Sequence, residues 1–473
     1  MNEALDLVGR YARAEGEERT EIAAQLSKLT QRSINETGRG LTLTEADLSN
    51  LDLRGANLRR ATLNRAVLHG TRLDGADLSE ATMVCPAMER TSLAGASLRS
   101  AYVHALAAQT CNFDDADLTG LRDATGTLFH GCSMRNVRLD GSHLAGSSFY
   151  QCDLSGATFS GANLQGSLIN ESMLERAVFQ GTCLDQLSIT KSSMREASLE
   201  GASGRGLVLQ RLTSADGLVL RDADLPRLRL DTMVSADWQA ARLKAVDGDF
   251  TDVTVTLADF SHADLTGATL RRCSWPGAEL TGASLVNGKI AGSTLRGAAA
   301  SGLRAENLGV VESDLSSAVL TGAMARCLTV RDTNMSSADL RDANLYRAMI
   351  TGDPPKGMSL RAADLENATL VQAYVAADLS DANLAGANCA YSRFSQSDLS
   401  GARLDGTNMY QSTWVKVAVT RASLNGVRPP VFADRCAGLA EAVEATGGAT
   451  STEFTSYLER FGAVLAAGRK GST

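Results

Sequence analysis

Residues 46–60 read ADLSN-LDLRG-ANLRR, so that a leucine stands at the centre of each group of five. From Leu43 to Leu424 a large apolar residue recurs at nearly every fifth position, and a small residue usually lies two places before it. A period of five fits neither an amphipathic helix nor an alternating strand. A strict short repeat over most of a chain indicates a solenoid, and a solenoid offers extended surface rather than a catalytic cleft.

Two positions of each repeat are expected to point inward. The central position, called i, is occupied by Leu48, Leu53 and Leu58, while position i−2 holds Ala46 and Ala56. One large and one small inward group per side would fill a narrow tube without voids. The other three positions hold residues that suit turns and solvated surface. Asp or Asn at i−1 can bond nearby backbone groups, and Gly at i+2 permits a positive φ.

The pattern A-(D/N)-L-x-x resembles the pentapeptide-repeat family over most of the chain. The resemblance implies an all-β fold, a right-handed quadrilateral β-solenoid with one pentapeptide per side and about twenty residues per coil. Neighbouring coils should then pair as parallel strands about 4.8 Å apart. A step of twenty also predicts two columns of stacked core residues. They are Phe129, Phe149, Ile169 and Ile189, and Leu139, Phe159, Phe179 and Leu199.

Changes in the repeat divide the chain into five expected segments. They are an N-terminal helical cap (1–40), a first solenoid block (41–203), a degenerate-repeat middle (204–254), a second solenoid block (255–425) and a C-terminal helical segment (426–473). The phase shifts by one residue near 121–127 and near 215–220, and it loses one near 371–379. Two prolines within Thr351–Gly357 cannot donate to a ladder, so this segment is expected to protrude as a loop.

Both ends of the chain show helical spacing instead of the five-residue pattern. Leu5, Val8 and Ala12 share one face, Ile22, Leu26 and Leu29 share another, and Thr20 is a candidate N-cap. Near the C-terminus an apolar stripe consists of Phe454, Leu458, Phe461 and Leu465. This stripe is expected to cap the solenoid end or to form a homodimer, as the family resemblance implies, and the two alternatives stay open together.

The composition of the chain favours the bacterial cytoplasm. No apolar run reaches transmembrane length, and the first ten residues, which include Glu3 and Asp6, lack the basic start of a signal peptide. Arginine far outnumbers lysine, a bias typical of GC-rich bacterial genomes. We expect no membrane association, while export as a secreted effector stays open.

The nine cysteines and five histidines predict neither disulfides nor a metal site. Cys111, Cys132, Cys152 and Cys273 occupy small inward positions. Parallel stacking near 4.8 Å exceeds the disulfide Cβ range of about 3.5–4.5 Å, so these thiols should be reduced core fillers. All histidines fall at outward positions, and no C-x-x-C pair, phosphate-binding loop or nucleophile motif occurs. We therefore expect no catalytic residue, no cofactor and no enzyme.

Two protein-binding functions fit such a rod. The first is a non-catalytic scaffold for protein–protein interaction, and the family resemblance implies a secretion-system accessory or effector as one form of it. The alternative, also implied by the resemblance, is a DNA mimic that binds DNA gyrase and gives resistance to topoisomerase poisons. A mimic about 90 Å long would carry on the order of 50 negative charges, whereas the net charge is −8. Direct nucleic-acid binding is not expected, because no basic stripe occurs.

The candidate partner-binding surface combines the most acidic part of the second block with the proline loop. It consists of Asp339, Asp342, Asp353, Pro354, Pro355, Asp364, Glu366, Asp378, Asp381 and Asp398. Arg341 and Arg361 interrupt this surface. The resemblance gives the loop additional interest, because a protruding loop contributes to activity in gyrase-protecting relatives.

Overall fold

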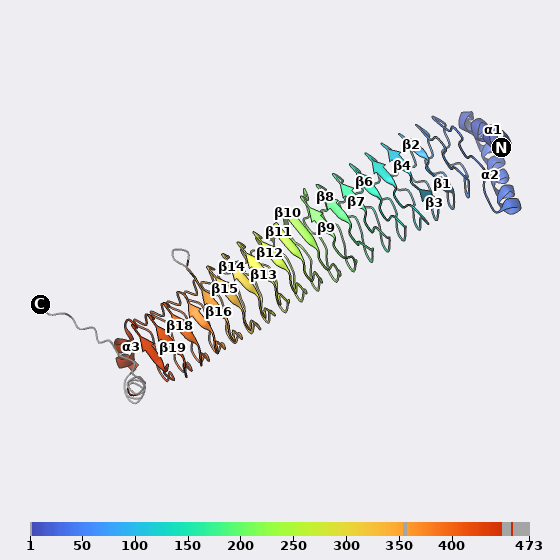
Figure 1. The fold of residues 1–473 in the computed structure, drawn as a ribbon. Coiled ribbons are helices and arrows are strands. Elements are labelled where there is room, and N and C mark those ends of the chain that lie inside the picture. The colour runs from blue at the N-terminus through green and yellow to red at the C-terminus, as the bar shows by residue number, and fades with distance from the viewer. Residues whose placement is uncertain (1, 353–356, 447–455, 457–473) are drawn as a thin grey trace. The chain divides into compact units, whose positions relative to one another are not determined.

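The computed structural model describes residues 2–352, 357–446 and 456. The chain divides into two compact units, Met1–Gln239 and Ala240–Thr473. Figure 1 shows the helices and the many short strands of both units. Each unit contains a parallel β-solenoid, so the fold predicted from the five-residue repeat is confirmed.

The first unit begins with two helices, α1 (Asn2–Arg13) and α2 (Gly16–Thr37), which short parallel strands follow. The strands are β1 (Thr82–Val84), β2 (Ala87–Glu89), β3 (Tyr102–His104), β4 (Ala107–Gln109), β5 (Leu128–His130), β6 (Ser148–Tyr150), β7 (Leu168–Asn170), β8 (Ser188–Thr190), β9 (Val208–Gln210) and β10 (Arg229–Ala236).

The second unit has the same kind of strands and one described helix near its end. Its elements are β11 (Asp249–Thr256), β12 (Thr269–Arg271), β13 (Lys289–Ala291), β14 (Gly309–Val311), β15 (Thr329–Arg331), β16 (Met349–Thr351), β17 (Tyr374–Ala376), β18 (Arg393–Ser395), β19 (Thr413–Val415), β20 (Phe432–Asp434) and α3 (Leu439–Thr446). Among the described residues of either unit, no helix has the length and apolar character needed to cross a membrane.

Four parallel ladders give the second unit four sides, named here in chain order. Side A is the ladder Met324, Asn344, Thr369, Asn388, Asn408 and Arg428. Side B is the ladder Met349, Tyr374, Arg393, Thr413 and Phe432. Side C is the ladder Asn334, Ser359, Asp378, Asp398 and Ala418. Side D is the ladder Asp339, Asp364, Asn383, Arg403 and Ser423. Each side also includes the outward residues that directly follow its ladder positions, up to the next corner.

The predicted core columns of the first unit are confirmed. Phe129 pairs with Phe149 in the strand register, and their ring centroids lie 5.0 Å apart. Phe159 and Phe179 stack with centroids 4.8 Å apart and an interplanar angle of 1°. All of these rings are fully buried. The large side chains at position i therefore form continuous stacks along the interior.

The corners of the coils use the chemistry expected of them. Asp47 Oδ1 accepts a hydrogen bond from the Ser49 backbone N–H at 3.0 Å, and Asp378 Oδ1 accepts one from Ser380 N–H at 2.9 Å. The residue at i+2 has a positive φ, whether it is a glycine or a longer side chain such as Arg60 at 57°. Most carboxylates at i−1 thus hold a turn.

The ladder register locates each phase shift. Ser97 pairs with Asp117, twenty residues later, but Tyr102 pairs with Asp123, twenty-one residues later. The extra residue therefore lies within the predicted interval 121–127. The residue lost near 371–379 is also confirmed, because the interval between paired residues returns from 19 to 20 between Tyr374 and Asp378.

Two other register changes differ from the prediction. Ser188 pairs with Val208 but Ser193 pairs with Ser214, so the second extra residue lies before 214 rather than at 215–220. A further residue is lost at the end of the second unit, where Thr413 pairs with Phe432. The sequence prediction did not include this last change.

A segment after β16 is inserted between paired residues and does not take part in the ladder pairing. Asn334 pairs with Ser359, an interval of twenty-five residues, so five extra residues leave the coil between Thr351 and Ser359. This insertion agrees with a loop at Thr351–Gly357, although its residues 353–356 lie outside the described part of the chain.

The segment that was expected to be degenerate continues the ladders in each unit. In the first unit, Trp238 is buried, and its Nε1–H donates to the Ala215 carbonyl at 3.0 Å. In the second unit, Phe250, Val253 and Val255 of β11 are buried. Although the repeat is irregular in residues 204–254, each five-residue segment there still places an apolar side chain in the core.

The first N-terminal helix buries a different face from the one predicted, whereas the second buries the predicted face. Val8 is buried, as expected, but Leu5 and Ala12 are only half-buried, while Leu7 and Tyr11 are buried instead. In α2, Ile22 and Leu26 are buried as predicted, and Leu29 is half-buried. The shift arises because α1 packs on the first coils through Tyr11.

The prediction that Thr20 caps the second helix is wrong. The helix begins at Gly16, and Thr20 Oγ1 donates to the Gly16 carbonyl at 3.3 Å inside the first turn. Its C-terminal end is formed by Gly38 in the left-handed region at φ 71°, where the N–H bonds the Ile34 carbonyl.

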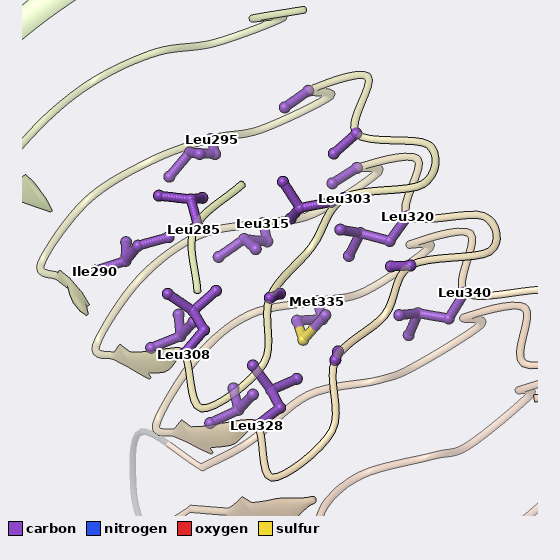
Figure 2. A pocket seen from close by; sticks show the side chains of 18 of the residues that line it. Leu285, Ile290, Leu295, Leu303, Leu308, Leu315, Leu320, Leu328, Met335 and Leu340 are labelled. Atoms are coloured by element: carbon purple, nitrogen blue, oxygen red, sulfur yellow. The ribbon is translucent and has the colours of Figure 1, made fainter. Parts of the chain in front are cut away.

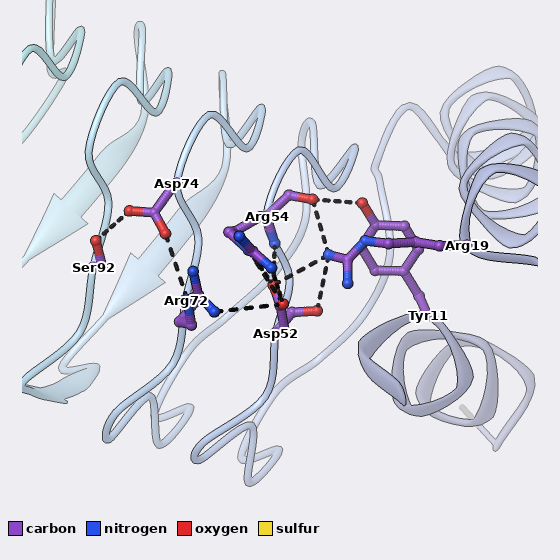
Figure 3. Close-up of polar contacts among 7 residues, drawn as sticks. All are labelled: Tyr11, Arg19, Asp52, Arg54, Arg72, Asp74 and Ser92. Carbon is purple, nitrogen blue, oxygen red and sulfur yellow. Dashed lines mark hydrogen bonds and ion pairs between the residues drawn. The ribbon is translucent and has the colours of Figure 1, made fainter. Parts of the chain in front are cut away.

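A polar network joins the helices to the first coils (Figure 3). Tyr11 Oη–H donates to the Arg54 carbonyl at 2.5 Å, and Arg19 Nη2 lies 3.1 Å from Asp52 Oδ1. The Arg54 guanidinium and then Arg19 hold the pKa of Asp52 well below its usual range. Further members of the network in the following coils are Arg72, Asp74 and Ser92. These contacts cover the first ladder edge of the first unit.

The cysteines occupy the predicted positions in the core. Cys111, Cys132 and Cys152 are buried in successive coils, and all nine cysteines of the chain are free thiols. Cys152 Sγ–H donates to the Phe129 carbonyl at 3.4 Å. Burial raises the pKa of the Cys273 thiol to about 11. These groups are therefore small core fillers, as their spacing indicated.

Candidate interaction surface

The predicted acidic surface divides between two neighbouring sides of the second unit. Asp339 and Asp364 are consecutive ladder positions of side D, whereas Asp378 and Asp398 are consecutive positions of side C. Asp364, Asp378 and Asp398 also accept hydrogen bonds from the backbone N–H two residues later. The structure thus brings these carboxylates together in columns but assigns each a local role at its own corner.

Arginine neutralises part of this surface on side D. Arg341 Nη2 lies 2.6 Å from Asp339 Oδ2, and Arg341 Nε lies 3.8 Å from Asp364 Oδ2. The Arg341 guanidinium holds the pKa of Asp339 below its usual range. In the next coil Asn383 Nδ2 donates to Asp364 Oδ1 at 2.9 Å and to Glu366 Oε2 at 3.2 Å. Side D is therefore a connected polar network with a reduced net charge.

Two predicted residues are exposed at corners. Asp342 and Asp381 both have positive φ, at 58° and 61°, and both are exposed. Arg361 Nε lies 3.7 Å from Asp381 Oδ2, a distance typical of a weak surface ion pair. Among the predicted carboxylates that the structure describes, these two are the most accessible, and they are suitable positions for substitution.

Several predicted site residues lie outside the described residues. They are Asp353, Pro354 and Pro355 of the loop, and Phe454, Leu458, Phe461 and Leu465 of the C-terminal stripe. Their roles in partner binding, capping or dimerisation stay predictions.

An apolar cavity lies inside the second unit, between its coils (Figure 2). Its volume is about 40 Å³, and its lining is entirely apolar. Two of the lining repeats have alanine at both inward positions, namely Ala298 with Ala300 and Ala323 with Ala325. Ligand pockets measure roughly 300–1,000 Å³ and present a few polar groups. The cavity is thus a packing defect rather than a binding site.

Titratable side chains do not converge on a metal site in the part of the chain that the structure describes, where no group of three or more His, Cys, Asp or Glu residues could hold an ion. His69, His143 and His262 are exposed, and His104 and His130 are half-buried, in agreement with their outward positions in the repeat.

Sequence reasoning missed a second surface on side A of the second unit. There the structure places Tyr346, Tyr391 and Tyr410 beside Arg326, Arg347 and Arg428. The signal in the sequence is the restriction of tyrosine, among the described residues of this unit, to positions 346–410. A fixed step of twenty does not align these residues, because the loop and the lost residue intervene.

Comparison with known proteins identifies the repeat. A family model described as pentapeptide repeats matches in eight copies, over residues 43–79, 132–170, 152–186, 258–297, 313–352 and 377–413. A search of curated proteins found no match to this chain.

Solved structures similar to this chain include QnrB1 and HetL. Trypsin-treated QnrB1, a plasmid-mediated fluoroquinolone resistance protein, is 20% identical with a TM-score of 0.28, and the match covers 46% of this chain and 100% of that chain. HetL, a pentapeptide repeat protein involved in heterocyst differentiation regulation in the cyanobacterium Nostoc sp. strain PCC 7120, is 15% identical with a TM-score of 0.10. That match covers 66% of this chain and 87% of the other.

Proposed function

We propose that this chain, which belongs to the pentapeptide-repeat family, is a non-catalytic scaffold that binds another protein along the sides of its second unit. The observation that carries the proposal is the parallel register of four ladders in consecutive coils. Because strands in such a ladder are about 4.8 Å apart, outward side chains form rigid and regularly spaced surfaces. The acidic corners Asp342 and Asp381 are the proposed contacts on sides C and D.

A bacterial secretion-system accessory or effector is one concrete form of this scaffold, and the cytoplasm is its proposed location. The family resemblance supports this form, and a stiff solenoid with mixed charges is sufficient for it. In either form the partner is another protein rather than nucleic acid, because the net charge of the chain is −8.

A second candidate function is binding to DNA gyrase as a local DNA mimic. The acidic columns on sides C and D, next to the insertion between Thr351 and Ser359, favour this candidate. The ion pairs of Arg341 and Arg361 weaken it, because they neutralise carboxylates that a mimic would present. We therefore rank the general scaffold above the gyrase inhibitor.

The test uses the tagged full-length chain as bait in a lysate of the cells that contain its gene. The variant Asp342→Lys/Asp381→Lys reverses two exposed corner charges. The matched control Asp115→Lys/Asp247→Lys reverses two exposed corner charges with the same positive φ, one in each unit. We expect a partner that the wild type and the control retain and that the first variant loses.

The outcomes separate the two candidates. Recovery of gyrase subunits, together with relief of quinolone inhibition in a supercoiling assay with purified gyrase, would favour the second candidate, particularly if deletion of 353–356 abolishes both. Partners retained equally by all variants would remove the acidic corners from the binding surface. Absence of any specifically retained protein would contradict the scaffold itself.

A further inference from the structure

Side A of the second unit carries a strip of tyrosine and arginine side chains that crosses successive coils. We call Arg326, Tyr346, Arg347, Tyr391, Tyr410 and Arg428 the tyrosine–arginine strip. The parallel bridges from Met324 to Asn344, and onward through Thr369, Asn388 and Asn408 to Arg428, place its members on five of six consecutive coils. On the remaining coil, Gln372 Oε1 accepts hydrogen bonds from Tyr346 Oη–H at 3.0 Å and from Arg347 Nε–H at 2.8 Å. The strip therefore forms one continuous surface within this unit.

The arginines of the strip lie over tyrosine rings. The Arg428 guanidinium carbon is 3.9 Å from the Tyr410 ring centroid, and those of Arg326 and Arg347 are 5.4 and 5.2 Å from the Tyr346 centroid. Tyr391 and Tyr410 meet edge to face with centroids 5.7 Å apart. These cation–π and aromatic contacts order long side chains at the surface before any partner arrives.

The positive charges of the strip are not neutralised by carboxylates. Within the described residues, side A holds no Asp or Glu from Met324 to Arg428, and none of its three arginines forms an ion pair. Arginines on the other sides of the same coils behave differently. Arg341 pairs with Asp339, and Arg403 pairs with Asp405 at 3.1 Å. The charges therefore differ around this unit: side A presents arginines without carboxylates from Met324 to Arg428, whereas arginines and carboxylates are mixed on sides C and D.

The strip also has the composition of an interface core. Tyrosine, methionine and arginine are enriched at such cores, while Lys, Glu and Asp are depleted. Tyr391 is 57% exposed and Met324 is 43% exposed, and Met349 on the neighbouring side B is 52% exposed. Tyrosine and arginine are also the residues that most often dominate binding energy.

We infer that the tyrosine–arginine strip binds the acidic surface of a different protein. This inference rests on the proposed scaffold function and adds a second binding side with its own partner chemistry. Charge complementarity selects an acidic partner, because the three arginines are exposed and have no carboxylate within ion-pair distance among the described residues.

Two other occupants fit the strip less well. An extended nucleic acid would need a continuous cationic track, whereas the strip has only three unpaired arginines and the net charge of the chain is −8. A second copy that offered its acidic sides C and D would form a heterologous contact, which produces rings or filaments rather than the common two-fold symmetric dimer.

The test measures fluorescence anisotropy with the full-length chain and a fluorescein-labelled peptide of repeated Glu-Leu-Asp triplets. The variant Arg347→Glu/Arg428→Glu changes the strip. The control Arg403→Glu/Arg421→Glu makes the same change of net charge at exposed arginines on sides D and C. We expect the strip variant to bind at least about tenfold more weakly and the control to stay within about twofold of the wild type. Tyr391→Ser should weaken binding about threefold.

Three results would overturn the inference. They are failure of the wild type to bind the acidic peptide, equal loss of affinity in the two double variants, and tighter binding of a labelled oligothymidylate that depends on the same arginines. Sedimentation velocity tests the remaining occupant, since self-association that the strip variant abolishes would assign the strip to a second copy. Retention of a partner through Asp342 and Asp381 in the bait experiment, without peptide binding, would leave the scaffold intact and remove only the strip.

Discussion

The two units use arginine and tyrosine in different ways. In the first unit, Arg59 and Arg60 both pair with Glu80, and Tyr150 Oη–H donates to Glu171 at 3.1 Å. In the second unit, the tyrosine–arginine strip pairs these residue types with each other, as Arg428 over Tyr410 illustrates. Polar side chains in the first unit therefore join one coil to the next, whereas the strip keeps its positive charge available to a partner.

The interiors of the two units also differ in how fully they are packed: aromatic rings fill the first unit, whereas alanines leave a cavity in the second. Phe129, Phe149, Phe159 and Phe179 fill the first unit with stacked rings. A stretch of the second unit has alanine at both inward positions of two repeats and encloses the cavity of about 40 Å³. The comparison indicates that the aromatic coils of the first unit contribute more stability per coil than the alanine-rich stretch around the cavity.

The largest expected effect is the substitution Phe159→Asp. An unpaired carboxylate would enter a fully buried aromatic stack, and the cost of several kcal/mol should unfold the neighbouring coils. Thermal melting by circular dichroism would measure the loss. Tyr391→Asp, at an exposed position of the second unit, should leave melting nearly unchanged. An unaltered melting curve for Phe159→Asp would show that the inward assignment is wrong.

Replacement of an inward alanine by valine should have opposite effects on the free energy of unfolding in the two units. Ala157 precedes the packed Phe159 side, so Ala157→Val should destabilise the first unit by about 1–3 kcal/mol through overpacking. Ala298 occupies position i−2 beside the cavity, and Ala298→Val should stabilise the second unit by about 0.5–1 kcal/mol by filling space. Urea unfolding of both variants gives the two values, and destabilisation of similar size in both would contradict the packing difference.

The stability of the two N-terminal helices should depend on pH through the carboxyl group of Asp52. The folded-state pKa of Asp52 is depressed, so its contribution is present above the unfolded value near about 4 and is lost as the pH falls through the folded value. The hydrogen-exchange protection of α1 and α2, measured relative to the intrinsic exchange rate at each pH, should therefore fall below about pH 4. Asp52→Asn should remove this pH dependence and cost about 1 kcal/mol at pH 7, since the carboxylate is partly exposed. That interpretation would fail if Asp52→Asn left the exchange of both helices unchanged at pH 7.

Thiol labelling has the smallest expected effect, since it leaves the fold intact. Cys85 in the first unit and Cys327 in the second are exposed, and both should react rapidly in the native protein. Cys132 and Cys273 are buried, with pKa values raised to about 12 and about 11, and should react only after unfolding. Mass spectrometry of timed labelling distinguishes the two classes, and fast native labelling of Cys132 would contradict its place in the core.

Much of the core could be predicted because the repeat length fixes it. A step of twenty aligned Phe129 with Phe149, since no residue is gained or lost between those two coils. The same rule did not find the register change between Arg428 and Phe432, where Pro429 and Pro430 replace the usual repeat. Thr20 was misassigned because helix propensity alone does not determine where packing lets a helix begin.

The candidate site was less predictable because it depends on which outward residues share a side. Asp339 and Asp398 were grouped by sequence proximity, but they lie on different sides. Tyr346 contacts Gln372, twenty-six residues later, and Tyr391 contacts Tyr410, nineteen residues later. Neither interval is twenty, so the strip became visible only when the ladder register was known.

Two single charge reversals test the central claim most directly. For each variant, the thermal stability and the affinity for the acidic peptide are measured. Arg135→Glu breaks an ion pair with Asp114 of 2.6 Å in the first unit, so it should lower the melting temperature and leave peptide affinity unchanged. Arg347→Glu should leave the melting temperature unchanged and weaken the affinity. If both variants lost stability, or if neither altered binding, the division of roles between the two units would be contradicted.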